Sequence, residues 1–273
     1  MRIDEAARLL TEGGIEDSTR EARLIFSHYT GISPALLLTE QGDFDNVNIA
    51  EAVRRRAKRE PLQYILGEAY FYREKYKVNE GCLIPREDTE ILVDYAVKHT
   101  PKGESILDLC TGSGCVAISV VKNTVATFAT AVDISDDALK LARENAAQNG
   151  VAERVRFSKQ DATTPGEALD GKYFAILSNP PYVTEEEYRH LEPELYHEPK
   201  IAFVGGEDGG IFYKALIPTY KPYLKPCGFM AFEIGRDQGQ MLSALADENG
   251  FSCEILKDFS GNDRVAVLKP KTL

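Results

Sequence analysis

Residues 105–123 read SILDLCTGSGCVAISVVKN: a short apolar run, a turn with two glycines, and an apolar run with helical spacing. A strand that passes through such a turn directly into a helix is typical of a βαβ unit. Gly112 and Gly114 permit a tight turn in which the backbone approaches a ligand closely. The N–H groups of the following helix point to the same place, where an anionic group can bind. The stretch therefore predicts an α/β fold with a ligand site at the end of this strand.

Apolar runs and helical patterns continue to alternate along the chain. Further strands are expected at 127–135, 154–162, 173–182 and 228–235. A helix over 136–150 ends at Gly150, and another near 237–248 precedes two terminal strands joined by a turn at Gly261 and Asn262. This alternation indicates a doubly wound, mostly parallel, Rossmann-like sheet of seven strands with an antiparallel edge.

The first 60 residues show the pattern of short amphipathic helices instead. The sequence STRE at 18–21 is a capping box, in which Ser18 caps a helix and Glu21 bonds back to it. We expect this helix to end at Gly31 and another, over 49–60, to end before Pro61. The second helix carries a basic run, which forms a solvated face or, alternatively, a patch for ribosomal RNA or an acidic protein. The run consists of Arg54, Arg55, Arg56, Lys58 and Arg59.

Residues 62–84 are rich in aromatic and β-branched side chains, and the turn signal NEG at 79–81 predicts a β-hairpin. A helix begins near Asp88 or Thr89. The predicted organisation is therefore a helical N-terminal domain, a hairpin linker and an α/β domain, at 1–60, 61–86 and 87–273.

Composition narrows the possible partners of this 273-residue chain. The formal net charge of −11 disfavours stable, non-specific DNA binding. The five cysteines are scattered and do not cluster with the four histidines, so we expect neither disulfides nor a metal site. There is no apolar run long enough to span a bilayer and no signal-peptide pattern, which predicts a cytoplasmic protein with no membrane partner.

Three acidic residues at strand ends suggest which ligand the glycine turn receives. Asp108 is placed to meet an ammonium group, and Asp133 to accept both hydroxyls of a ribose. Asp161, or a neighbour, is placed to face an adenine amino group. A ligand with these groups and no pyrophosphate is S-adenosylmethionine. The pattern Gly112-x-Gly114-x-x-Ala117 also fits a nicotinamide dinucleotide, but that ligand gives Asp108 no cation to pair with.

The strand at 173–182 ends in SNPPY, and the two prolines make the chain leave the sheet stiffly. Asn179 should therefore face the same crevice as the glycine turn. Its side-chain oxygen and the carbonyl of Pro180 can accept the two hydrogens of a planar –NH₂ group, and the ring of Tyr182 can stack on that group. The pattern predicts methyl transfer to a planar nitrogen, achieved mainly by positioning.

Together with DLCTGSG and VDIS, these residues resemble a class I methyltransferase that acts on a planar nitrogen. Further segments make the chain similar to the peptide chain release factor glutamine methyltransferases over nearly its whole length. These segments are EPLQYILG (60–67), LIPREDTEILV (83–93), NPPYV (179–183), EP (198–199), GGEDGGIFY (205–213) and EIG (233–235).

The resemblance implies N5-methylation of the glutamine in the Gly-Gly-Gln motif of class 1 release factors, with S-adenosyl-L-homocysteine as the second product. It implies that Asn179, Pro180, Pro181 and Tyr182 hold the substrate amide, and that residues 84–86 lie near the active site. It also implies that residues 1–60 dock the release factor, a protein of translation termination. The implied cofactor contacts are Cys110, Thr111, Gly112, Ser113, Gly114, Asp133, Asp161, Ala162 and Asn179.

Two positions depart from the family pattern. Cys110 stands where many relatives have glycine, which predicts a sterically tighter turn. Ala162 stands where some relatives place an aromatic ring beside adenine. Three alternatives stay open at this point: methylation of a ribosomal protein glutamine or of an exocyclic amine of RNA or DNA, a non-catalytic cofactor-binding module, and a nicotinamide oxidoreductase.

Overall fold

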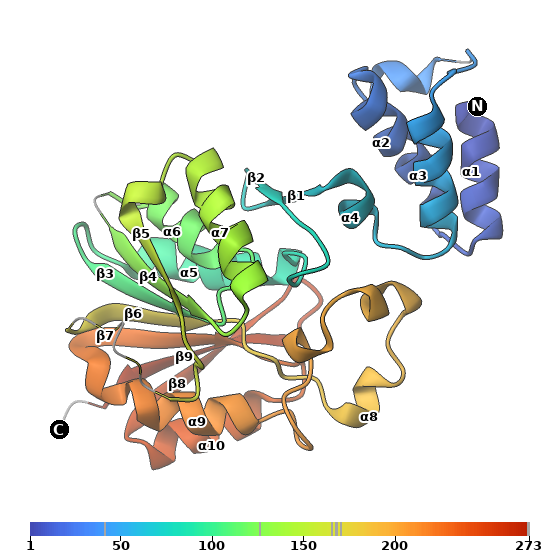
Figure 1. The fold of residues 1–273 in the computed structure, drawn as a ribbon. Helices are drawn as coiled ribbons and strands as arrows, with labels where there is room; N and C mark the ends of the chain where they lie inside the picture. Colours follow the sequence, from blue (N-terminus) through green and yellow to red (C-terminus); the bar gives the residue numbers. More distant parts are fainter. Residues whose placement is uncertain (41, 126, 165, 167–168, 170, 272–273) are drawn as a thin grey trace. The chain divides into compact units, whose positions relative to one another are not determined.

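The computed structural model describes residues 1–40, 42–125, 127–164, 166, 169 and 171–271 (Figure 1). The chain forms two compact units. The helical unit comprises Met1–Glu68 together with Glu192–His197, and the α/β unit comprises Ala69–Leu191 together with Glu198–Leu273.

A seven-stranded sheet is the centre of the α/β unit, as predicted. Its strands lie in the order β5-β4-β3-β6-β7-β9-β8, and all neighbours are parallel except β9, which is antiparallel to both β7 and β8. The bounds are β3 Ser105–Leu109, β4 Phe128–Asp133, β5 Val155–Lys159, β6 Tyr173–Ser178, β7 Leu224–Glu233, β8 Phe251–Lys257 and β9 Asp263–Pro270.

Helices cover both faces of this sheet (Figure 1), because the interior strands are apolar on both sides. On one face, Ile106 of β3 joins a core with residues of α5 and α6. On the other, Leu107 joins a core with residues of α9 and α10. The helices of the unit are α5 Glu90–His99, α6 Cys115–Asn123, α7 Asp136–Gln148, α8 Glu185–Tyr188, α9 Ile211–Tyr220 and α10 Gly239–Glu248.

The strand order reverses between β3 and β6, which lie side by side in the middle of the sheet. Their register pairs Leu109 with Ser178 at the carboxyl ends, and the Ser178 hydroxyl donates a hydrogen bond to the Leu109 carbonyl at 2.7 Å. Open α/β sheets bind ligands at such a reversal, outside the carboxyl ends of the strands. The fold thus places the segments that follow β3 and β6 next to one crevice.

The helical unit has its own apolar core, which includes Leu10, Phe26 and Val53. Its helices are α1 Ile3–Glu12, α2 Ser18–Thr30, α3 Val47–Ala57 and α4 Leu62–Leu66. The predicted end of α2 at Gly31 is confirmed, since this glycine has a φ of 74°. The predicted cap by Ser18 is wrong: the Ser18 hydroxyl bonds to Thr11 at 2.8 Å instead.

The carboxylate of Glu21 also leaves the predicted cap, because it pairs with the guanidinium of Arg56. Arg56 is 7% exposed and also donates to Glu194 at 3.1 Å. The prediction of a solvated basic face is therefore wrong at this position. Arg59 likewise donates to Glu194, at 2.7 Å. Partial burial acts to raise the pKa of Glu194, but a backbone N–H bond and the two guanidiniums together lower it.

The predicted hairpin exists, but its turn lies elsewhere. Strands β1 Glu68–Phe71 and β2 Glu74–Lys77 form a two-stranded sheet around Tyr72 and Arg73, both of which have positive φ. Residues 79–81 form a separate turn after the hairpin, in which the N–H of Gly81 donates to the Asn79 side chain. The true turn contains neither glycine nor asparagine, so the sequence carries no turn signal there. The Tyr72 hydroxyl donates a hydrogen bond to Asp94 of α5, and this contact holds the turn.

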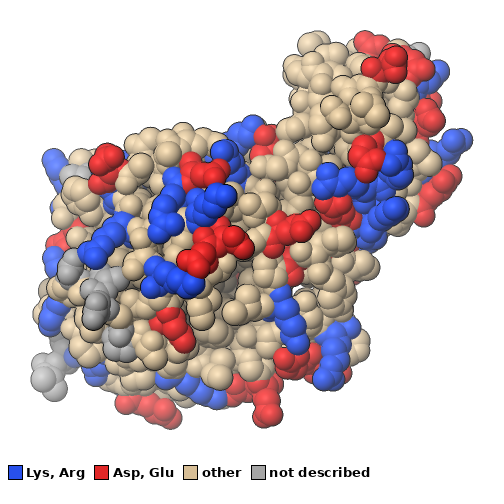
Figure 2. Space-filling model, in the orientation of Figure 1, with Lys and Arg blue, Asp and Glu red and all other residues tan. Residues whose placement is uncertain are grey.

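In the described part of the chain, no helix combines the length and apolarity that a bilayer crossing requires. Acidic and basic side chains are interspersed over the visible face of the α/β unit (Figure 2). The five cysteines are all free thiols.

We expect Arg56→Ala to destabilise the helical unit by about 3–5 kcal/mol, because it leaves the partly buried Glu21 without its cation and Glu194 with Arg59 alone. Hydrogen exchange of the amides of α1–α3 measures the free energy of opening for this unit. Arg54→Ala is the matched control in the same helix: its pair with Glu51 is exposed, so we expect a change within about 0.5 kcal/mol. Equal effects of the two variants would contradict a structural role for the buried pair.

Candidate active site

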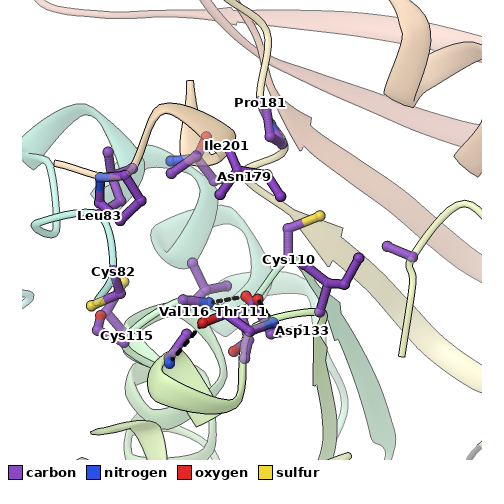
Figure 3. A pocket seen from close by; sticks show the side chains of 18 of the residues that line it. Cys82, Leu83, Cys110, Thr111, Cys115, Val116, Asp133, Asn179, Pro181 and Ile201 are labelled. Atoms are coloured by element: carbon purple, nitrogen blue, oxygen red, sulfur yellow. Dashed lines mark hydrogen bonds between the residues drawn. The ribbon is translucent and has the colours of Figure 1, made fainter. Parts of the chain in front are cut away.

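A cavity of about 290 Å³ lies at the carboxyl ends of β3, β4 and β6. Figure 3 shows Asn179, Pro181 and Ile201 on one side of it and Thr111 and Asp133 on the other. The glycine turn and the strand-end amide thus face one space, as the sequence predicts. The predicted site residues that line it are Cys110, Thr111, Gly112, Ser113, Asp133, Asp161, Ala162, Asn179 and Pro181.

The turn after β3 owes its shape to three residues with positive φ: 58° at Cys110, 55° at Gly112 and 82° at Gly114. A Cβ on Gly112 would contact no other described atom within 4 Å, so its backbone is open to a ligand. Gly114 does not line the cavity; a Cβ there would lie 2.9 Å from the Ile118 side chain. Cys110 takes a conformation that costs a non-glycine residue about 1 kcal/mol, whereas the sterically tighter turn expected from its departure stays a prediction.

The Asp133 carboxylate holds this turn in place. One oxygen accepts the N–H of Gly112 at 2.8 Å and the other accepts the N–H of Ser135 at 3.0 Å. Burial raises the pKa of Asp133, and these N–H groups oppose the shift. Each carboxylate oxygen keeps a free lone pair, so the group is able to accept ligand hydroxyls inside the cavity.

Asp108 is placed differently from our expectation. It is 1% exposed and does not line the cavity, so the structure gives no support for a direct contact with a ligand ammonium. Its carboxylate accepts the Thr111 hydroxyl at 2.5 Å and the N–H of Ala117 at 3.2 Å, which ties the turn to the start of α6. Burial raises its pKa to about 7, against the effect of those two hydrogen bonds.

The cavity lining as a whole is largely apolar, and Asp161, Ala162 and Thr163 after β5 belong to it. Ala162 is 6% exposed and supplies no ring, in line with the departure noted in the sequence. An aromatic side chain reaches the cavity from another element: Phe212 of α9 is part of its lining, as is Ile134 after β4. The lining therefore offers apolar side chains that could pack against a planar base without a ring at position 162. The sequence analysis assigned no role to Phe212, although the segment GGEDGGIFY at 205–213 contains it.

The orientation of the Asn179 amide is visible in its hydrogen bonds. Its –NH₂ group donates to the Thr89 hydroxyl oxygen at 3.2 Å. Its side-chain oxygen accepts no hydrogen bond from the described part of the chain. Asn179 lines the cavity, so this acceptor is available to a ligand.

The other predicted substrate residues lie around this amide. Pro180 and Pro181 are buried, and Pro181 lines the cavity. Pro180 and Tyr182 are not part of the cavity lining. The Tyr182 hydroxyl donates to Glu233 at 3.1 Å, and burial raises its pKa above the ordinary value.

Sequence reasoning assigned no role to Glu233, which is 1% exposed and accepts hydrogen bonds from both Tyr182 and Thr89. Burial raises its pKa to about 7, opposed by these two hydrogen bonds and by the charge of Arg264. Glu198 was also missed: it is 3% exposed, accepts the N–H of Ile84 at 2.9 Å and pairs with Arg86. The motifs EIG and EP contain both acids, and a glutamate inside an apolar strand such as FMAFEIG was an available signal.

The cavity is suited to binding and positioning rather than to covalent catalysis. Burial raises the pKa of the Cys82 thiol to about 12 and also raises that of Cys110, so both remain protonated at neutral pH. The described residues contain no cluster of three or more His, Cys, Asp or Glu side chains able to hold a metal ion. What the cavity offers a ligand is a set of fixed acceptors, at Asp133 and Asn179, beside an apolar wall.

The chain matches the models of two protein families. One, described as "PrmC N-terminal domain", matches residues 3–67, and the other, "Methyltransferase small domain", matches residues 87–198. The chain is also similar to a methyltransferase structure from Pyrococcus furiosus, with a TM-score of 0.54, 19% identity, and coverage of 72% of this chain and 89% of that one. This likeness supports the class I methyltransferase fold.

Similarity to curated relatives extends along nearly the whole chain. A release factor glutamine methyltransferase from Thermodesulfovibrio yellowstonii is 41% identical over 93% of this chain and 94% of its own length. Another, from Fusobacterium nucleatum subsp. nucleatum, is 38% identical over 98% of this chain and 77% of its own. With this similarity and the class I fold, the chain belongs to the release factor glutamine methyltransferase family.

Proposed function

We propose that this protein transfers a methyl group from S-adenosylmethionine to the side-chain amide nitrogen of the glutamine in the Gly-Gly-Gln motif of peptide chain release factors. The observation that carries the proposal is that Asn179 lines the same cavity as the glycine turn and Asp133, while its side-chain oxygen accepts no hydrogen bond from a described residue. A primary amide has a planar –NH₂ group that suits such an acceptor. The relatives from Thermodesulfovibrio yellowstonii and Fusobacterium nucleatum are named release factor glutamine methyltransferases, and that name gives a release factor glutamine as their substrate.

The cavity residues fit the proposed cofactor. Asp133 accepts the ribose hydroxyls, the open backbone at Gly112 approaches the amino-acid portion, and the apolar wall with Ala162 and Phe212 packs against adenine. Cys110, Thr111 and Ser113 complete the turn around it, and Asp161 borders the adenine end. When bound, S-adenosylmethionine supplies a methyl group that its positive sulfur has already activated.

The substrate amide is held by the segment after β6. In this proposal the Asn179 oxygen accepts one amide hydrogen, the Pro180 carbonyl accepts the other, and the Tyr182 ring stacks on the amide plane. Pro181 lines the cavity beside them. The two acceptors favour a nitrogen whose lone pair is less delocalised, and they stabilise the positive charge that develops on it.

The reaction then needs little acid–base chemistry from the protein. The amide nitrogen attacks the methyl carbon, the carbon–sulfur bond breaks, and its electron pair stays on sulfur. The methylated nitrogen is cationic and loses its proton readily to water. Alignment of nitrogen, carbon and sulfur is the main contribution of the chain, and positioning of this kind contributes about 7–11 kcal/mol in favourable cases.

The docking of the release factor on residues 1–60 and a cytoplasmic location are further parts of the proposal. The absence of stable DNA binding likewise stays a prediction.

Incubation with S-adenosylmethionine and a purified release factor tests the function directly. We expect the intact mass of the release factor to increase by one methyl group, and peptide mapping to locate it on the glutamine of the Gly-Gly-Gln motif. Ribosomal protein and DNA serve as comparison substrates. Modification of either one in preference to the release factor would replace the proposal, and cofactor binding without transfer to any substrate would indicate a non-catalytic module.

We expect Asn179→Ala to lower kcat by about 100-fold or more, because the lost contact is made to the reacting nitrogen. The affinity for S-adenosylmethionine, measured by calorimetry, should change by less than about threefold. Equal losses of cofactor affinity and kcat would argue against a substrate role for this side chain.

Asp133→Ala should instead weaken S-adenosylmethionine binding by at least about tenfold, because two ribose hydroxyls lose a charged acceptor. Asp136→Ala is the matched control: this nearby carboxylate is exposed and pairs with Lys159, so cofactor affinity should not change. Calorimetry of both variants decides the point, and unchanged affinity in Asp133→Ala would remove this residue from the cofactor site.

A further inference from the structure

We propose that Thr89 and Glu233 are positioning residues that fix which end of the Asn179 amide faces the substrate. The inference rests on the proposed methylation of a glutamine amide and adds residues that do not hold the substrate themselves.

The three side chains form one continuous chain of hydrogen bonds. The Thr89 hydroxyl donates to Glu233, and its oxygen accepts the –NH₂ group of Asn179 at 3.2 Å. Thr89 is 2% exposed and borders the cavity, whereas Glu233 is 1% exposed and lies behind it, outside the lining. The residues come from three separate elements: η2 (Glu87–Thr89), the end of β7 and the segment after β6.

The direction of these bonds follows from the chemistry of the groups. At pH 8 Glu233, whose pKa burial raises to about 7, is mostly ionised and only accepts hydrogen bonds, so the single hydroxyl proton of Thr89 points to Glu233. The Thr89 oxygen can then only accept from the neighbouring amide, which must present its –NH₂ end. The remaining end of Asn179, the oxygen, is thereby turned to the cavity.

This direction matters because a carboxamide has nearly the same shape in either orientation. A flipped Asn179 would present –NH₂ to the –NH₂ of the substrate, and two donors cannot bond to each other. The flip would leave S-adenosylmethionine binding nearly intact and remove the acceptor from the reacting nitrogen. The carboxylate of Glu233 therefore influences the substrate through the Thr89 hydroxyl.

Glu233 is suited to this task because it receives two donors at once. Tyr182 donates to its other oxygen at 3.1 Å, so each carboxylate oxygen of Glu233 accepts one hydrogen bond. Two charges face it: Arg264 favours the ionised form of Glu233, and Asp88 opposes it. A glutamine at this position has only one acceptor oxygen, so it must offer an –NH₂ group to Thr89 or to Tyr182.

The test uses the 273-residue chain at pH 8 with a release factor and S-adenosylmethionine. Thr89→Val keeps the shape but removes the hydroxyl, and we expect kcat to fall about tenfold with little change in cofactor affinity. Thr89→Ser should restore most of that loss. Thr100→Val is the matched control, because the Thr100 hydroxyl is also buried at the end of α5 and has no hydrogen-bond partner among the described residues; its kcat should not change.

A double-mutant comparison separates positioning from a merely structural role. In the Asn179→Ala background there is no amide to orient, so adding Thr89→Val should lower kcat no further. A further tenfold loss in that background, or wild-type kcat in Thr89→Val alone, would overturn the inference. Thr89→Ala, which also removes the hydroxyl, carries the same comparison in both backgrounds and serves if Thr89→Val does not fold. If the wild-type protein does not methylate the glutamine at all, the proposed function fails. If Asn179→Ala loses activity but Thr89→Val turns over normally, only the present inference fails.

Discussion

Parallel hydrogen bonding between β3 and β6 holds Leu109 opposite Ser178, and the geometry of the cavity depends on that register. Cys110, which begins the glycine turn, directly follows Leu109. Asn179, whose side-chain oxygen is the proposed acceptor for the substrate amide, directly follows Ser178. A slip of one residue would turn every side chain of a strand to the opposite face of the sheet. The bond from the Ser178 hydroxyl to the Leu109 carbonyl adds a side-chain contact at the point where the strands end.

The site combines unfavourable local features that the surrounding fold stabilises. Cys110 occupies a backbone region that favours glycine, and Asp108 and Glu233 are carboxyl groups with almost no exposure to water. Each acid is compensated by hydrogen-bond donors from its own surroundings. A rigid environment of this kind lowers the reorganisation needed when charge develops on a substrate, which is how fixed dipoles assist a reaction without acting as acids or bases.

The seven strands, their order of succession and the glycine turn could be predicted because periodicity and turn chemistry are local properties of the sequence. Asn179 was also predictable, since two prolines fix the backbone around it. The cap at Ser18, the exposure of Arg56 and the hairpin turn at Tyr72 were not, because in each case a distant partner decides the outcome. Thr89 and Glu233 bond across 144 positions of sequence, and a glutamate looks the same in a sequence whether it is buried or solvated.

The six residues Glu192–His197 belong to the helical unit although the chain on both sides of them belongs to the α/β unit. Arg56 and Arg59 bind this segment by hydrogen bonds to the carboxylates of Glu192 and Glu194. The helical unit is thus not a detachable N-terminal module. A recombination event that exchanged only the first 68 residues with those of a relative would separate two arginines from their acidic partners, so the two stretches of sequence are expected to be inherited together.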